Sequence, residues 1–277
     1  MKIPDDVVDV LKRATITGTR LELPEQLDRA TYMKVDKVLK ALGFKWNRSA
    51  KAHICAGAGI PNDLTDALRA GTVVTAQDEG FFPTPPRIAQ MLFDGPWRGG
   101  PFSIRDEIES VSHRIYRILE PSCGTGDLLI ALDKHLTAWT ACPFPPYVVG
   151  IEKNSTRIAV ASAFPDWRNF HPHFCTGDFL EARSADAAHG EYDLILMNPP
   201  FGGGQDATHV LHALKFLRRG GLLLGIGSAG LMFREDRKEH VRLREIIDAG
   251  GEIVALPEGS FKPATDVNTC RFFIRGE

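Results

Sequence analysis

The chain has 277 residues, of which 43% are hydrophobic and 25% charged, a composition typical of a globular protein with a sizeable core. Its formal net charge of −2 excludes nucleic-acid binding through a global positive field, so such binding requires a local basic surface. The 5 cysteines are scattered without a C-x-x-C pair, and no apolar run approaches the length of about 18 residues that a membrane span requires, which predicts reduced thiols, no metal site and a cytoplasmic protein.

Residues 1–75 are expected to form a small separate module. Residues 19–23 alternate as a strand does, residues 24–42 have apolar residues at helical spacing, and residues 53–55 form a candidate second strand. Basic residues interleaved with aromatic ones favour contact with a nucleic acid, although a solvated helix face explains any single lysine equally well. The candidate DNA contacts are Lys45, Trp46, Arg48 and Lys51.

After a linker at residues 70–80, a proline-rich segment opens a helix that runs to residue 93. Strands and helices then alternate through residues 76–277, which predicts a doubly wound, mostly parallel sheet. Strands are expected at residues 116–120, 147–152, 173–175, 192–197 and 222–226, and helices at 127–136, 155–164, 208–217 and 238–248. Residues 252–256 and 271–274 are expected to be the last two strands, paired antiparallel.

The most informative motif is Asn198, Pro199, Pro200 and Phe201, which directly follows the apolar strand at 192–197. An amide, a proline carbonyl and an aromatic face at a strand end can hold the exocyclic amino group of a flat heterocycle and stack on its ring. Such an amine becomes nucleophilic when acceptors draw it toward tetrahedral geometry. A strand followed by a simple proline turn is the alternative.

Three other strand ends add to this pattern. The sequence from Glu120 to Asp127 joins a strand to a helix through a glycine-bearing turn that lets a ligand approach the backbone. Glu152 ends the next strand, where a carboxylate can accept both ribose hydroxyls of a nucleoside. Asp178 and Phe179 follow the third strand. Asp178 can accept a hydrogen bond from an adenine amino group, while Phe179 packs on the adenine ring.

The series resembles the S-adenosylmethionine-dependent adenine-N6 DNA methyltransferases of the gamma arrangement, in which a Phe-x-Thr-Pro segment such as residues 82–85 precedes the glycine turn. The resemblance covers residues 81–273. It implies a Rossmann-like class I methyltransferase domain with a seven-stranded, mostly parallel sheet and an antiparallel last strand, beside the small N-terminal α+β module. It also implies that S-adenosyl-L-methionine binds at Phe82, Thr84, Glu120, Pro121, Ser122, Cys123, Gly124, Gly126, Asp127, Glu152, Lys153, Asp178, Phe179 and Asn198.

The same resemblance implies that a flipped target adenine contacts Phe201 and Phe261, the latter in a segment similar to the family's late motif. The front segment at residues 43–54 is similar to the leader of small orphan methyltransferases of phages, plasmids and bacterial chromosomes. His209 and His212 are candidate acid–base groups, although a helix-capping or solvated role is the simpler interpretation.

Few residues follow Phe261, so target recognition is expected from the N-terminal module, the insertion at 94–114 and the loops at 202–207 and 228–237. The expected partner is double-stranded DNA, with a homodimer on a palindromic sequence. Three alternatives remain open: a ribosomal RNA guanine-N2 methyltransferase, a protein glutamine-N5 methyltransferase, and a catalytically silent DNA-binding or cofactor-sensing module.

Overall fold

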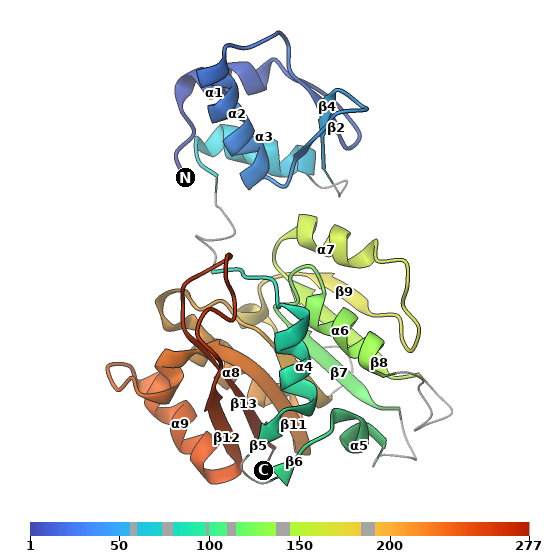
Figure 1. Ribbon diagram of the computed structural model, residues 1–277, viewed down its shortest axis with the longest axis vertical. Helices are drawn as coiled ribbons and strands as arrows, with labels where there is room; N and C mark the ends of the chain where they lie inside the picture. The colour runs from blue at the N-terminus through green and yellow to red at the C-terminus, as the bar shows by residue number, and fades with distance from the viewer. Residues whose placement is uncertain are drawn as a thin grey trace. The chain divides into compact units, whose positions relative to one another are not determined.

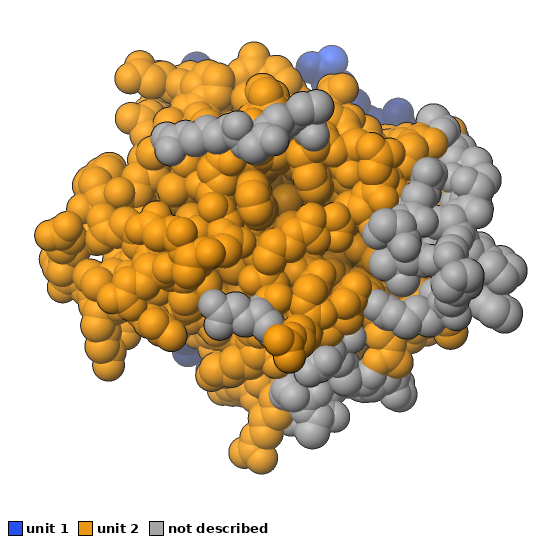
Figure 2. Space-filling model, turned by 90° about the horizontal axis from the view of Figure 1, so that it is seen from below, with its two compact units in different colours: residues 1–79, 155–160 blue, residues 80–154, 161–277 orange. Residues whose placement is uncertain are grey.

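The structure is a computed structural model that describes residues 1–55, 60–73, 80–97, 100–109, 115–136, 145–183 and 192–276. The chain divides into two compact units (Figures 1 and 2): an N-terminal unit of residues 1–79 and 155–160, and a sheet unit of residues 80–154 and 161–277. The domain boundary predicted near residue 75 lies outside the described residues. Among the described helices, none is long and apolar enough to cross a membrane.

The N-terminal unit contains a four-stranded antiparallel sheet of order β1-β2-β4-β3. Its elements are α1 (Asp5–Lys12), β1 (Thr15–Thr17), β2 (Arg20–Glu22), α2 (Arg29–Ala41), β3 (Lys45–Asn47), β4 (Ala52–Ile54) and α3 (Ile60–Ala70). Side chains from the helices and from β2 form one apolar core, which includes Val7, Leu21, Val38 and Leu64. Buried residues of α2 contribute to this core together with residues of α1, β2 and α3.

Helix α2 begins later than the sequence pattern predicts. The Asp28 side chain accepts hydrogen bonds from the N–H groups of Ala30 and Thr31, so it caps a helix whose first residue is Arg29. The residues from Pro24 to Leu27 precede this cap and lie outside the helix.

A seven-stranded sheet of order β12-β13-β11-β10-β7-β8-β9 forms the centre of the sheet unit (Figure 1). Its strands are β7 (Arg117–Pro121), β8 (Tyr147–Glu152), β9 (His173–Thr176), β10 (Tyr192–Met197), β11 (Leu217–Ser228), β12 (Gly251–Ala255) and β13 (Thr269–Arg275). Neighbouring strands from β11 to β9 are parallel, whereas β13 is antiparallel to both β11 and β12. The predicted sheet is therefore confirmed.

Helices pack on both faces of this sheet. They are α4 (Pro86–Asp94), α5 (Ile104–Glu109), α6 (Asp127–His135), α8 (Gln205–Ala213) and α9 (Lys238–Gly250). The chain also contains α7 (Ser155–Ser162), of which residues 155–160 are grouped with the N-terminal unit. The remaining elements are the 3₁₀ turns η1 (Phe179–Glu181), η2 (Gly202–Gly204), η3 (Leu214–Phe216) and η4 (Ala229–Met232) and a short hairpin of β5 (Pro96–Trp97) and β6 (Gly100–Pro101). Side chains alternate across a strand, so Ile118 joins the core under α4 and α6 while Leu119 joins the core under α8 and α9.

Helix α8 and strand β11 differ from their predicted bounds. Helix α8 starts at Gln205, before the predicted start at residue 208, because Gly204 turns the chain with a φ of 76° directly before it. Strand β11 extends well beyond the predicted 222–226, because it pairs with β10 on one side and with β13 on the other. In the insertion at 94–114, α5 ends at Glu109, and residues 110–114 lie outside the described residues.

Candidate active site

The candidate active site lies where the carboxyl ends of β7, β8 and β10 meet. Strand β7 lies between β10 and β8, so the chain order reverses at this point of the sheet. Open α/β sheets bind ligands in the crevice formed at such a reversal. The turn that follows β7 and the Asn198 side chain that follows β10 are therefore neighbours.

The turn after β7 has an unusual backbone. Ser122 has a φ of 114°, and Gly124 and Gly126 have φ values of 54° and 80°. A Cβ atom on Gly124 would lie 2.2 Å from the Phe81 ring, so only glycine fits beneath this ring. The Ser122 N–H donates to the Ile151 carbonyl of β8 at 2.8 Å, which anchors the strained turn to the neighbouring strand.

Carboxyl groups lie around this turn. Glu152 accepts from the Gly124 N–H at 3.0 Å through Oε2 and from the Asn154 N–H at 2.9 Å through Oε1. Glu120 is 2% exposed, and its Oε2 has no hydrogen-bond partner among the described residues. Burial, reinforced by Asp127, raises the pKa of Glu120 well above its ordinary value. The turn thus has one carboxylate that fixes its backbone and a second acid whose neutral form is favoured.

Asn198 has a side-chain amide that is held in one orientation. Its Nδ2 donates to the Phe82 carbonyl and to Thr84 Oγ1, each at 2.9 Å. Its Oδ1 is buried and has no hydrogen-bond partner within the described part of the chain. Buried polar atoms are usually paired, so this oxygen is an unused acceptor on a residue that lines the site.

Aromatic rings pack behind Asn198. The Phe82 and Phe201 rings stack with centroids 5.8 Å apart, and Phe261 meets Phe201 edge to face at 5.9 Å. Phe201 is 7% exposed and Phe261 1% exposed. The Phe201 ring proposed to receive a target base is therefore already in contact with protein on the face that meets Phe82.

These groups enclose a hollow of about 10 Å³ in the sheet unit, the room of about one water molecule. Its lining brings together the segment before α4, the turn after β7 and the residue after β10. The lining residues are Phe81, Phe82, Pro83, Thr84, Glu120, Ser122, Cys123, Asp127 and Asn198. Burial raises the pKa of the Cys123 thiol, which favours an unreactive, protonated sulfur.

The other predicted cofactor residues lie outside this lining. Asp178 accepts from the Leu180 N–H at 2.8 Å and so caps η1, while Phe179 is 3% exposed and packs against His212 at 4.9 Å. Lys153 is exposed, and Pro121 is buried at the end of β7. Glu152 is connected to the site by the hydrogen bond that it accepts from the Gly124 N–H of the turn.

His209 is the residue that the sequence interpretation placed wrongly. It is 7% exposed, its Nδ1 lies 3.5 Å from Ser122 Oγ, and burial lowers its pKa to about 4. His212 is half-buried, with Nε2 2.9 Å from the Ala182 carbonyl. His209 is therefore not solvated, whereas His212 contacts the carbonyl of Ala182, the C-cap residue of η1, which agrees with a capping role. The signal that was available is helical spacing, because His209 shares a face of α8 with Asp206 and Ala213, all of them buried.

The N-terminal unit presents the predicted basic residues on an exposed edge. Strand β3, which contains Lys45 and Trp46, is an edge strand whose residues are all exposed. Trp46 is 46% exposed, and its ring packs edge to face on His53 with centroids 5.1 Å apart. Arg48 and Lys51 lie in the exposed turn that joins β3 to β4. We name Lys45, Trp46, Arg48 and Lys51 the β3 surface.

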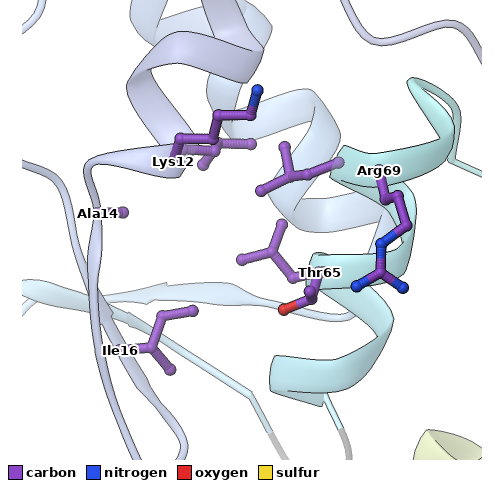
Figure 3. A pocket seen from close by; sticks show the side chains of 8 residues that line it. Lys12, Ala14, Ile16, Thr65 and Arg69 are labelled. Atoms are coloured by element: carbon purple, nitrogen blue, oxygen red, sulfur yellow. The ribbon is translucent and has the colours of Figure 1, made fainter.

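A second hollow, of about 520 Å³, lies within the N-terminal unit between α1, β1 and α3 (Figure 3). Aliphatic side chains form most of its wall, and Lys12 and Arg69 contribute its charges. The lining residues are Leu11, Lys12, Ala14, Ile16, Leu64, Thr65, Leu68 and Arg69. None of the described lining residues has a carboxyl group or an amide side chain, whereas the lining of the candidate active site includes Glu120, Asp127 and Asn198.

Comparison with protein-family models and with curated proteins gives no match. Solved structures similar to this chain include a Listeria monocytogenes protein named as a putative class I S-adenosylmethionine-dependent methyltransferase. The two sequences are 16% identical, the match covers 70% of this chain and 60% of that chain, and the TM-score is 0.50. The methyltransferase subunit of a type I restriction-modification system from Streptococcus thermophilus has 17% identity, coverage of 79% and 50%, and a TM-score of 0.52.

The M protein of the type I restriction enzyme EcoKI has 15% identity, coverage of 99% of this chain and 57% of that chain, and a TM-score of 0.51. The chain thus spans between 50% and 60% of the length of these three proteins. The likeness establishes the fold of the chain, which is the Rossmann-like α/β fold of class I methyltransferases.

Proposed function

We propose that the chain transfers a methyl group from S-adenosylmethionine to the N6 amino group of an adenine flipped out of double-stranded DNA. The observation that carries this proposal is the Asn198 amide, whose Nδ2 is anchored while its buried Oδ1 has no partner among the described residues. An unused amide oxygen at a strand end suits a target amine, because it can accept a hydrogen bond from the amine N–H without removing the proton.

The residues around the turn fit the proposed cofactor. The Phe81 ring lies against the Gly124 backbone, which a ligand can approach closely once this ring moves, and Glu120 and Asp127 line the hollow beside it. Carboxyl oxygens can accept hydrogen bonds from the ammonium group of this donor, and the Glu152 carboxylate keeps the turn in shape by accepting from the Gly124 N–H. When bound, S-adenosylmethionine supplies a methyl group that is already activated by its sulfonium.

The chemistry left to the protein is positioning. Asn198 Oδ1 and the Pro199 carbonyl would accept from the target amine, which directs the nitrogen lone pair at the methyl group. The hollow of about 10 Å³ is smaller than either ligand, so the Phe81 and Phe82 rings are expected to move outward when ligands bind.

DNA adenine is favoured over the alternative amines by two observations. Residues 82–85 form the Phe-x-Thr-Pro segment, and its Thr84 contacts the Asn-Pro-Pro-Phe segment directly. Two of the similar folds are subunits of type I restriction-modification enzymes, which are named as methyltransferases. Ribosomal RNA and protein glutamine remain the competing substrates of the same amine chemistry.

Transfer of a tritiated methyl group to duplex DNA, ribosomal RNA and protein in parallel reactions tests the proposal. We expect label in duplex DNA and its recovery as N6-methyladenine after nuclease digestion. Recovery of label as a guanine or glutamine derivative, or no label in any substrate while the donor is bound, would contradict it.

The β3 surface is proposed to contact the DNA backbone. Replacing Lys45 and Arg48 together by alanine should lower the slope of log affinity against log salt concentration by about 1.8, because each lost phosphate contact releases about 0.9 counterions fewer. Fluorescence anisotropy with labelled duplex at several salt concentrations measures this slope. The matched control is Lys12→Ala with Arg69→Ala, which removes the same charge elsewhere in the unit. Equal slopes for the two double variants would remove the β3 surface from the interface.

A further inference from the structure

A short stretch of chain before helix α4, residues 80–84, packs along the Asn-Pro-Pro-Phe segment. Gly80 has a φ of 67°, and a Cβ atom on it would lie 3.1 Å from the Gly202 nitrogen and 3.3 Å from the Phe201 nitrogen. The Phe82 ring stacks on the Phe201 ring. Thr84 is 7% exposed, and its hydroxyl oxygen accepts from Asn198. Gly80 at the start of the first segment therefore lies against the end of the second, and Thr84 at the end of the first is hydrogen-bonded to Asn198 at the start of the second.

The hydrogen bonds from Asn198 Nδ2 define which end of the amide faces the site. Both protons of this nitrogen have an acceptor, namely the Phe82 carbonyl and Thr84 Oγ1. Rotating the amide by half a turn would place Oδ1 against the Phe82 carbonyl, and two acceptors would then face each other without a proton. The same rotation would aim two donors at the position of the target amine, which is itself a donor.

We propose that Thr84, together with the Phe82 carbonyl, is a positioning element that holds the Asn198 amide with Oδ1 toward the target amine. This rests on the proposed function of Asn198 and names a residue that the function requires in addition. It differs from the role in cofactor binding that the family resemblance implies for Thr84. The two roles separate experimentally, because a positioning residue alters the rate of the chemical step and a cofactor ligand alters the affinity for the donor.

The experiment compares Thr84→Val, which keeps the side-chain shape and removes the acceptor, with Thr84→Ser, which restores the hydroxyl. The full-length protein is used, with Thr208→Val on the exposed face of α8 as the matched control. Single-turnover methyl transfer is measured with the donor at saturation, and donor affinity is measured by calorimetry. We expect Thr84→Val to slow transfer about tenfold, since small misplacements of reacting groups have effects of this order. Its donor affinity should change less than about twofold, and Thr84→Ser should recover most of the rate.

A readout without catalysis completes the test. In ¹⁵N-labelled protein, the side-chain amide protons of Asn198, identified by their loss in Asn198→Ala, should exchange with solvent slowly in the wild type and in Thr84→Ser, and faster in Thr84→Val. Unchanged exchange in Thr84→Val, or a loss of donor affinity with an unchanged rate, would overturn the positioning role. The proposed function has its own contradicting result, which leaves the positioning role intact: wild-type protein whose Asn198 amide protons exchange slowly but which transfers no methyl group to DNA.

Discussion

Replacing Asn198 by alanine is expected to slow methyl transfer by about two hundredfold, corresponding to roughly 3 kcal/mol of barrier, which is typical for the loss of one preorganised hydrogen-bonding group at a reacting centre. The physical reason is that the unpartnered Oδ1 is the acceptor that draws the target amine toward the geometry of attack. Single-turnover transfer of a tritiated methyl group to duplex DNA measures the effect.

The affinity of this variant for S-adenosylmethionine should stay within about twofold of the wild-type value, because the turn after β7 and its carboxyl groups are unchanged. Asn268→Ala, which removes an exposed amide side chain from the same unit, is the matched control and should keep the wild-type rate. Wild-type transfer by Asn198→Ala would show that the acceptor lies elsewhere.

Replacing Glu152 by glutamine is expected to weaken donor binding by about ten- to a hundredfold, because hydrogen bonds to a charged acceptor contribute about 1.5–3 kcal/mol. In the wild type, both carboxylate oxygens accept from backbone N–H groups, those of Gly124 and Asn154. A glutamine amide offers one acceptor oxygen and turns an NH₂ group toward the other N–H. The turn would then lose the conformation that receives the cofactor.

Isothermal titration calorimetry with S-adenosylmethionine measures this loss, and thermal unfolding without ligand separates it from a general loss of fold. Glu181→Gln provides the control, since Glu181 is exposed on η1. If Glu152→Gln binds the donor as tightly as the wild type does, the carboxylate is not needed to shape the turn.

The sequence predicted the sheet well where strands are buried on both sides. Strands β8 and β10 have the predicted bounds, because a continuous apolar run between polar residues leaves little freedom in where a buried strand starts and stops. Strands β1 and β3 were missed, since each is a short edge segment with exposed residues. Their partners β2 and β4 lie only a few residues further along the chain, but segments of three mostly exposed residues are too short to show a hydrophobic pattern that distinguishes a strand from a turn.

Part of the candidate site could also be predicted. Polar residues that end successive parallel strands must meet at one end of the sheet, and the order of the motifs therefore brought Glu120, Ser122 and Asn198 into one group. The burial of His209 and the covering of Phe201 by Phe82 could not be predicted, because both depend on how α8 and the segment before α4 pack in three dimensions.

The amino-acid sequence by itself determined the alternation of strands and helices, the antiparallel end of the sheet and the positions of the polar strand ends, because hydrophobic periodicity and turn residues are local properties of the chain. Only the tertiary structure decided the orientation of the Asn198 amide and left its Oδ1 without a partner among the described residues. That orientation is set by Phe82 and Thr84, which lie more than a hundred positions earlier in the chain, and the hydrogen bonds between such distant residues exist only once the sheet has formed.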